Sequence, residues 1–134
     1  MTVRRAFRRL EGTRRMGMTT VRAELAHIGE RERRTQVDMM VDSGAIYSVV
    51  PAPVLRGIGV EPERMERFWL ADGRSVRRQI GHVFFEIERS AGISRVIFGR
   101  AGDACLLGMV TLEELGLSLD PLKRRLRPLK LMIA

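Results

Sequence analysis

The chain has 134 residues, of which 45% are hydrophobic and 30% are charged, and it contains one cysteine. This length fits a single domain, and no uninterrupted apolar run approaches the length needed to cross a bilayer, so we expect no membrane span. A single cysteine excludes an internal disulfide and favours a reducing, cytoplasmic location. We interpret Cys105 as a packed small hydrophobe, because it stands in an apolar stretch with no basic neighbour to activate its thiol.

The net charge of +8 is concentrated at the start of the chain. The first 17 residues hold six arginines and one glutamate, whereas residues 18–134 hold 18 basic and 15 acidic residues. We predict a basic, disordered leader over 1–17 and a folded domain over 18–134. A basic arm of this kind can contact nucleic acid or an anionic surface. The alternative is a targeting segment, because Val3, Phe7 and Leu10 fall at helical spacing.

Alternation of apolar and polar residues over 19–28 predicts a strand with one solvated face. A charged turn at 29–34 and a second apolar run at 35–41 complete a predicted hairpin. His27 lies on the apolar face of the first strand, and His82 stands alone later in the chain. Neither histidine has a second histidine or cysteine with which to share a metal ion, so we predict no metal site and no cofactor.

The second predicted strand delivers Asp42 directly into a turn formed by Ser43, Gly44 and Ala45. A carboxylate at the end of a buried strand is costly unless hydrogen-bond donors surround it. Ser43 offers a hydroxyl, and Gly44 lets the backbone fold closely enough to direct its N–H groups at the carboxylate. This pattern is typical of an aspartate that takes part in acid–base chemistry, so Asp42 is the candidate catalytic residue.

Prolines end the next predicted strand, residues 46–50, because Pro51 and Pro53 cannot donate to a sheet ladder. One or two helical turns are expected over 54–58. The polar residues 61–67 are expected to be irregular. This part of the chain therefore contributes one strand and one short helix.

The dipeptide Asp72-Gly73 predicts a tight turn at the centre of a hairpin over 68–76. Apolar and polar residues then alternate over 83–87, which indicates another strand. A turn is expected at 90–92, followed by a strand over 93–98.

A short all-apolar strand suited to full burial is predicted over 104–107. The sequence from Thr111 to Glu114 is a capping-box signature, and Gly116 is placed to end the helix that follows. Asp120-Pro121 makes the final turn, and leucines in the basic tail suggest one or two terminal strands. Seven or more short strands with one clear helix predict an all-β domain of barrel type.

Three of these features together resemble a known family. The run Asp42-Ser43-Gly44-Ala45 after apolar residues looks like the catalytic motif of the retropepsin-like (retroviral-type, clan AA) aspartic proteases, specifically their small bacterial relatives. The run from Cys105 to Met109 looks like the apolar-apolar-Gly motif of that family, and the segment 70–76 stands where the family carries its flap hairpin. The resemblance covers residues 19–131 and implies a closed barrel of short strands with one or two short helices.

The resemblance also implies how the site works. Aspartic peptidase chemistry uses two facing carboxylates, and this chain has one Asp-Ser-Gly, so an active site would need Asp42 from each subunit of a homodimer. Ser43, Gly44, Ala45 and Gly108 would support the site, although Ser43 stands where many members have threonine. The substrate would be a peptide or protein with apolar side chains at the scissile bond. The implied flap residues are Ala71, Asp72, Gly73 and Arg74. The implied substrate groove comprises Ile46, Val49, Val50, Leu70 and Val76.

Two other functions fit the residues. The same fold could serve as a peptide-binding or assembly module with little or no peptidase activity, because one motif per chain says nothing about turnover. A small basic nucleic-acid-binding β-barrel is the second alternative, suggested by the sequence pI near 11.2. Aromatic residues make up only 5% of the chain, which is few for base stacking, and the basic excess sits mainly in the leader. We therefore expect no nucleic-acid contact apart from that leader.

Overall fold

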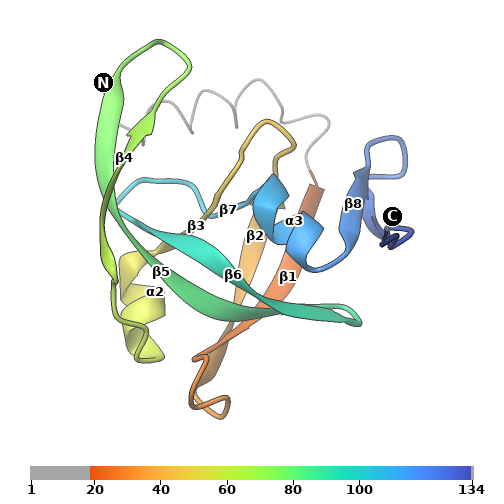
Figure 1. Cartoon of the computed structure of the whole chain (residues 1–134), viewed down its shortest axis with the longest axis horizontal. Coiled ribbons are helices and arrows are strands. Elements are labelled where there is room, and N and C mark those ends of the chain that lie inside the picture. The colour runs from red at the N-terminus through yellow and green to blue at the C-terminus, as the bar shows by residue number, and fades with distance from the viewer. Residues whose placement is uncertain (1–18, 134) are drawn as a thin grey trace.

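The computed structural model of the chain describes residues 19–133 and shows a sheet that closes on itself (Figure 1). Its strands and helices are β1 (Thr19–Ala26), β2 (Arg34–Val41), β3 (Ser48–Pro51), α2 (Ala52–Gly57), β4 (Arg64–Trp69), β5 (Ser75–Ile87), β6 (Ser90–Gly99), β7 (Leu106–Leu107), α3 (Met109–Glu114), β8 (Leu117–Asp120) and β9 (Arg125–Pro128). Seven strands lie in the order β1-β2-β7-β3-β6-β5-β4, and β1 also pairs with β5, so the strands form a ring. The prediction of an all-β chain with short helices is confirmed, and the predicted leader, residues 1–17, lies outside the described residues.

The β1–β2 hairpin follows the alternation seen in the sequence. The two strands are antiparallel, with Ala23 opposite Val37. Ala23 and Leu25 are fully buried, whereas Arg22 on the other face is exposed and pairs with Asp38 across the hairpin. The period of two therefore separates a core face from a solvated face, as predicted.

Two clusters of buried apolar side chains hold the ring together. The larger cluster gathers side chains from every strand except β4 and from both helices of the described residues. The smaller cluster consists of Val49, Ile80, Ile97 and Leu106. Val49 belongs to the smaller cluster and Val50 to the larger, because successive residues of a strand point to opposite faces. The strand β3 is therefore covered on both faces.

The strand β4 corrects the prediction that residues 61–67 are irregular. It begins at Arg64, stands at the edge of the sheet order and pairs with β5, placing Arg64 opposite Ile80. An edge strand leaves much of its surface in water, so charged side chains are no obstacle to it. The polarity of the segment was therefore not evidence against a strand.

The strand β5 runs for 13 residues without a break. The predicted hairpin strand and the predicted strand at 83–87 are two parts of it, and Gly81 lies inside it. A Cβ atom on Gly81 would come within 3.0 Å of the Phe98 ring and 3.2 Å of the Glu61 carbonyl oxygen. Glycine is therefore used here for close packing and does not interrupt the strand.

The turn between β5 and β6 is displaced from its predicted place. The pairing of Ile87 with Ser90 leaves Glu88 and Arg89 as the turn residues, and the φ of Glu88 is 56°. The predicted turn at 90–92 is wrong, because those residues already belong to β6. A two-residue turn that lacks glycine carries little sequence signal.

The start of α3 also differs from the prediction. Gly108 is its N-cap residue, no side chain caps its first turn, and Thr111 lies within the helix. The predicted capping box is therefore wrong, whereas Gly116 follows the helix with a φ of 71°, as expected for a glycine that ends one. The preceding strand, β7, is limited to two residues within the predicted strand 104–107.

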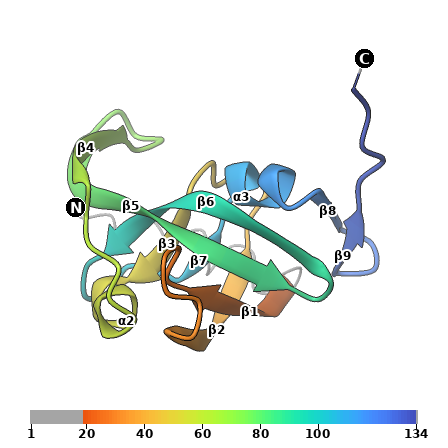
Figure 2. The same ribbon diagram turned by 60° about the horizontal axis from the view of Figure 1, so that its bottom comes forward.

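The chain closes with the β8–β9 hairpin, which turns at Asp120 as predicted. The Asp120 carboxylate accepts hydrogen bonds from the backbone N–H groups of Leu122 (3.1 Å) and Lys123 (3.2 Å). Beyond β9 the segment 129–133 extends away from the ring without forming a strand (Figure 2). Neither helix in the described residues has the length and apolar character that crossing a membrane requires.

Candidate functional site

The turn that carries Asp42 is built where β2 meets β7. These strands are parallel, with Val41 opposite Leu107, and the Asp42 N–H donates to the Leu107 carbonyl at 3.4 Å. The turn is closed by the Ala45 N–H, which donates to the Asp42 carbonyl at 3.0 Å. The Asp42 carboxylate accepts a hydrogen bond from the Gly44 N–H at 2.8 Å, as the sequence predicts for a glycine next to the carboxylate.

Asp42 is almost completely buried, with 1% of its surface exposed, whereas Ser43 and Gly44 are exposed. Burying a carboxylate is costly, and the Gly44 N–H offsets part of that cost by donating to it. The turn therefore holds the Asp42 carboxylate just below the surface, with the Gly44 N–H as a donor to it.

Gly108 packs closely against the segment that follows this turn. The loop at Gly108 passes so close to the segment after Ala45 that a Cβ atom on Gly108 would lie 2.5 Å from the Tyr47 carbonyl carbon. The next two N–H groups, of Met109 and Val110, donate to the carbonyls of Ala45 and Ile46, both at 2.9 Å. The structure thus brings Gly108 and the Asp42 turn together, as the sequence analysis expects.

A buried network of hydroxyl groups lies beneath this contact, and sequence reasoning missed it. The Thr111 hydroxyl lies 2.6 Å from the Ser48 hydroxyl and 2.9 Å from the Ser94 hydroxyl. The Ser48 oxygen also accepts a hydrogen bond from the Gly108 N–H at 3.0 Å. The network ties β3, β6 and α3 to the loop at Gly108. Its only sequence signal is that polar residues interrupt otherwise apolar stretches, which does not reveal their partners.

The predicted flap residues form the tip of the β4–β5 hairpin, which projects beyond the ring (Figure 1). The Leu70 N–H donates to the Arg74 carbonyl at 2.7 Å, and the Gly73 N–H donates to the Leu70 carbonyl at 3.0 Å. The Asp72 carboxylate accepts from the Arg74 N–H at 3.0 Å and from the Arg74 side chain at 2.8 Å. Gly73 has a φ of 88°, which explains why the turn uses glycine. Ala71 is exposed at the same tip.

The β4–β5 hairpin contacts the segment that follows the Asp42 turn. The Phe68 ring on β4 packs edge to face against the Tyr47 ring, with 5.7 Å between the ring centroids. An aromatic pair of this geometry contributes about 0.5–1.5 kcal/mol beyond the burial of its area. The hairpin and the turn therefore touch through Phe68 and Tyr47, a contact that the sequence analysis did not anticipate.

The residues expected to line a substrate groove are in different environments. Ile46 is exposed at 61%, and Leu70 and Val76 are half-buried on the hairpin. Val49 is covered within the smaller apolar cluster. Val50 cannot line the same surface, because it packs in the larger cluster with no exposed area, and this part of the expectation is corrected.

The other four aspartates of the chain have partners of their own. Asp38 pairs with Arg22 on the exposed face of β2, and Asp72 belongs to the hairpin tip. Asp103 pairs with Arg78, and Asp120 holds the last turn. The Asp-Ser-Gly turn thus supplies one aspartate per chain.

Cys105 precedes β7 and is partly buried. Burial raises the pKa of the Cys105 thiol from its ordinary value of 9.0 to about 11, and the negative charge of Asp38 acts in the same direction. A thiol with a raised pKa is a poor nucleophile at neutral pH, in keeping with the interpretation of Cys105 as a packed side chain. Among residues 19–133, no group of three or more histidine, cysteine or acidic side chains is placed to hold a metal ion.

The sequence matches no model of a known protein family and no curated protein.

Proposed function

We propose that the chain is a retropepsin-like aspartic endopeptidase that works as a homodimer, with Asp42 contributed by each subunit. One observation carries the proposal: a buried carboxylate at the end of β2 sits in an Asp-Ser-Gly turn and accepts the Gly44 N–H at 2.8 Å, and the loop at Gly108 packs against the segment that leaves this turn. Asp72 and Asp120 accept comparable backbone hydrogen bonds at less buried positions, so the feature that distinguishes Asp42 is the burial of its carboxylate, which is 1% exposed.

In the proposed dimer the two Asp42 carboxylates share one proton, because like charges held that close cannot both ionise. The ionised carboxylate takes a proton from a bound water, whose oxygen attacks the carbonyl carbon of the scissile peptide. The protonated carboxylate donates its proton to the carbonyl oxygen. Collapse of the tetrahedral intermediate breaks the C–N bond, and the leaving amine takes a proton from the pair of carboxylates.

A homodimer is proposed because one chain supplies one aspartate to such a site. A twofold axis through the site would make the contact isologous, so the same surface of each chain would be covered. Apolar side chains in the segment after β9 are exposed and offer a surface for a second copy to cover. These side chains are Leu129, Leu131, Met132 and Ile133.

The β4–β5 hairpin is proposed as the flap that closes over the bound peptide and excludes water. Its contact with Tyr47 through Phe68 would transmit the position of the hairpin to the segment beside Asp42. The exposed Ile46 and the half-buried Leu70 and Val76 favour apolar side chains next to the scissile bond. A peptide-library profile checks this preference, and cleavage beside charged residues would contradict it.

The burial of Asp42 favours a second candidate, a peptide-binding module with little turnover. A carboxylate that is 1% exposed in the single chain meets water and substrate only after the turn or its surroundings open. A statine-type transition-state mimic separates the two candidates, because tight binding requires a working pair of carboxylates. Weak binding of the mimic together with tight binding of an uncleaved peptide would support the module.

The test of the proposal is Asp42→Asn, compared with the matched variant Asp38→Asn on the same strand. We expect Asp42→Asn to abolish cleavage of a generic protein substrate at mildly acidic pH while the protein stays folded and dimeric. Asp38→Asn should keep its activity, because Asp38 is exposed and pairs with Arg22. Analytical ultracentrifugation gives the mass. Cleavage that survives in Asp42→Asn, or a strictly monomeric active protein, would reject the proposal.

A further inference from the structure

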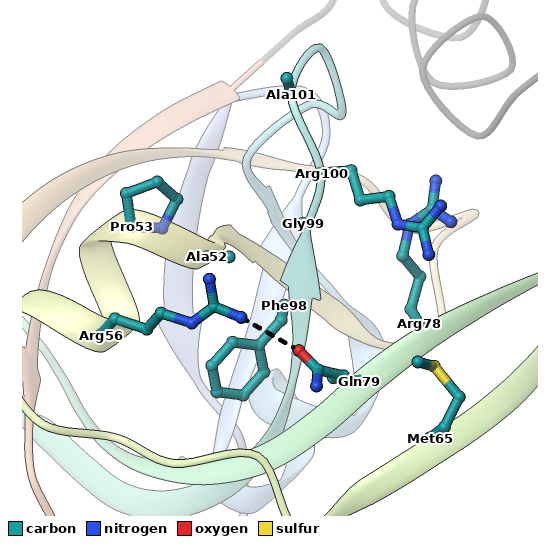
Figure 3. A pocket seen from close by; sticks show the side chains of 10 residues that line it. All are labelled: Ala52, Pro53, Arg56, Met65, Arg78, Gln79, Phe98, Gly99, Arg100 and Ala101. Carbon is teal, nitrogen blue, oxygen red and sulfur yellow. Dashed lines mark hydrogen bonds between the residues drawn. The ribbon is translucent and has the colours of Figure 1, made fainter.

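A cavity of about 410 Å³ lies beside the base of the β4–β5 hairpin, between α2 and the loop that follows β6 (Figure 3). Its volume falls within the range of small-molecule sites, about 300–1,000 Å³. Asp42 does not line it. Neither the sequence motifs nor the proposed peptidase reaction uses this cavity.

Three arginines line the cavity, and their charges are balanced unequally. Arg78 is buried and forms a forked ion pair with Asp103, at 3.0 and 3.5 Å, so its charge is neutralised. Arg56 donates to the side-chain oxygen of Gln79 at 3.2 Å, which is a neutral acceptor. Within residues 19–133, no carboxylate forms an ion pair with Arg56 or Arg100. The cavity therefore carries two uncompensated positive charges.

The loop that carries Arg100 is held in place by the same ion pair. The Asp103 carboxylate accepts the Arg100 backbone N–H at 2.8 Å while it also accepts the Arg78 side chain. The backbone of Arg100 is thus fixed, and its guanidinium group remains available at the cavity wall (Figure 3). A fixed backbone lowers the ordering cost that a ligand would otherwise meet on binding.

Apart from Gln79, the other side chains of the wall are apolar. Pro53 comes from α2, Met65 from β4, and Phe98 from β6. Met65 is exposed, so its thioether can pack against a ligand. An apolar wall with a few cationic groups suits a ligand that has an apolar body and an anionic group.

We propose that this cavity binds a small organic anion, with a carboxylate or phosphate group contacting Arg56 and Arg100 and an apolar body packing against Pro53 and Met65. Guanidinium groups match both oxyanions, because their N–H groups donate in pairs to two oxygen atoms. The proposal is independent of peptidase activity, since it concerns binding at residues that the peptidase reaction does not use.

Calorimetric titration of the full chain with phenyl phosphate tests the proposal. We expect saturable one-to-one binding that Arg56→Gln and Arg100→Gln each weaken by about tenfold, as expected for the loss of one charge-assisted contact. Both side chains are exposed and are not part of the buried ion pair, so the variants should fold as the wild type does. A thermal melt of each variant verifies this.

Arg89→Gln is the matched control, because it removes one positive charge from an exposed turn between β5 and β6. It should leave the affinity unchanged. If Arg89→Gln lowered the affinity for phenyl phosphate as much as the cavity variants do, binding would depend only on net charge and the proposal would be overturned. The absence of saturable binding at millimolar concentrations of phenyl phosphate would also overturn it. Inorganic phosphate and benzoate complete the series. Equal affinity for inorganic phosphate and phenyl phosphate would overturn the proposed apolar contact.

Discussion

Gly108 and the carbonyl group of Tyr47 lie so close that no side chain fits between them: a Cβ atom on Gly108 would stand 2.5 Å from the Tyr47 carbonyl carbon and 2.7 Å from its oxygen. The obstacle is backbone on both sides, so it cannot rotate away as a flexible side chain could. The contact fixes the loop before α3 against the segment that leaves the Asp42 turn.

We therefore expect Gly108→Ala to lower the free energy of unfolding by about 2 kcal/mol or more, because the backbone must move to admit the methyl group. Gly57→Ala is the control, since no atom lies within 4 Å of a Cβ at that position in α2. It should be neutral or stabilise the protein by up to about 1 kcal/mol, as expected for alanine in a helix. Urea unfolding measures both. Equal effects of the two substitutions would contradict the close packing at Gly108.

The hydroxyl network predicts a loss of stability in Thr111→Val. The substitution keeps the shape of the side chain but removes a buried partner of both Ser48 and Ser94. Leaving buried polar groups unsatisfied costs about 1–3 kcal/mol. Thr20→Val on the exposed face of β1 is the control and should change stability by less than about 0.5 kcal/mol. A loss no larger in Thr111→Val than in Thr20→Val would show that the network contributes nothing to stability.

The Arg78–Asp103 ion pair predicts a large effect of Asp103→Asn. The two side chains are 7% and 1% exposed, so removing the carboxylate charge leaves the Arg78 cation buried without its counterion. We expect a loss of about 3 kcal/mol. Asp38→Asn breaks an ion pair with Arg22 whose side chains are 65% and 61% exposed, and it should cost less than about 1 kcal/mol. Chemical denaturation of both variants at neutral pH and equal ionic strength makes the comparison.

The raised pKa of Cys105 predicts a loss of stability at alkaline pH. Above pH 9.0 the thiol of the unfolded chain loses its proton, whereas the folded chain keeps it until about pH 11. The contribution of this thiol to stability is therefore complete below pH 9.0 and falls by about 2 kcal/mol as the pH rises to 11. The difference in unfolding free energy between wild type and Cys105→Ala, measured at several pH values, isolates this effect from the titration of other groups. A difference that does not change over that range would contradict it.

The elements with local signals were predicted well. The alternation over 19–28 and 35–41 corresponds to the β1–β2 hairpin, and Asp72-Gly73 corresponds to the tip of the β4–β5 hairpin. Both signals arise from residues that are neighbours in the chain, because strand periodicity and turn geometry act over a few residues. The position of Asp42 at the end of β2, and its hydrogen bond from Gly44, follow from the same kind of local signal.

The misplaced elements were those whose structure depends on distant partners. β4 forms because β5 lies beside it, although the residues from Arg64 to Arg67 are mostly charged. Thr111 resembled a helix cap, yet its hydroxyl bonds to Ser48, 63 positions away. Local sequence could not reveal either partner.

By itself, the sequence determined the alternating strands, the glycine-bearing turns and the Asp-Ser-Gly motif, because each depends on the backbone preferences of adjacent residues. The tertiary structure alone decided which strands close the ring, how Gly108 meets the Asp42 turn and which arginines surround the cavity beside α2. These features bring together residues dozens of positions apart, and their energies arise from burial, close packing and charge balance that exist only once the chain has folded.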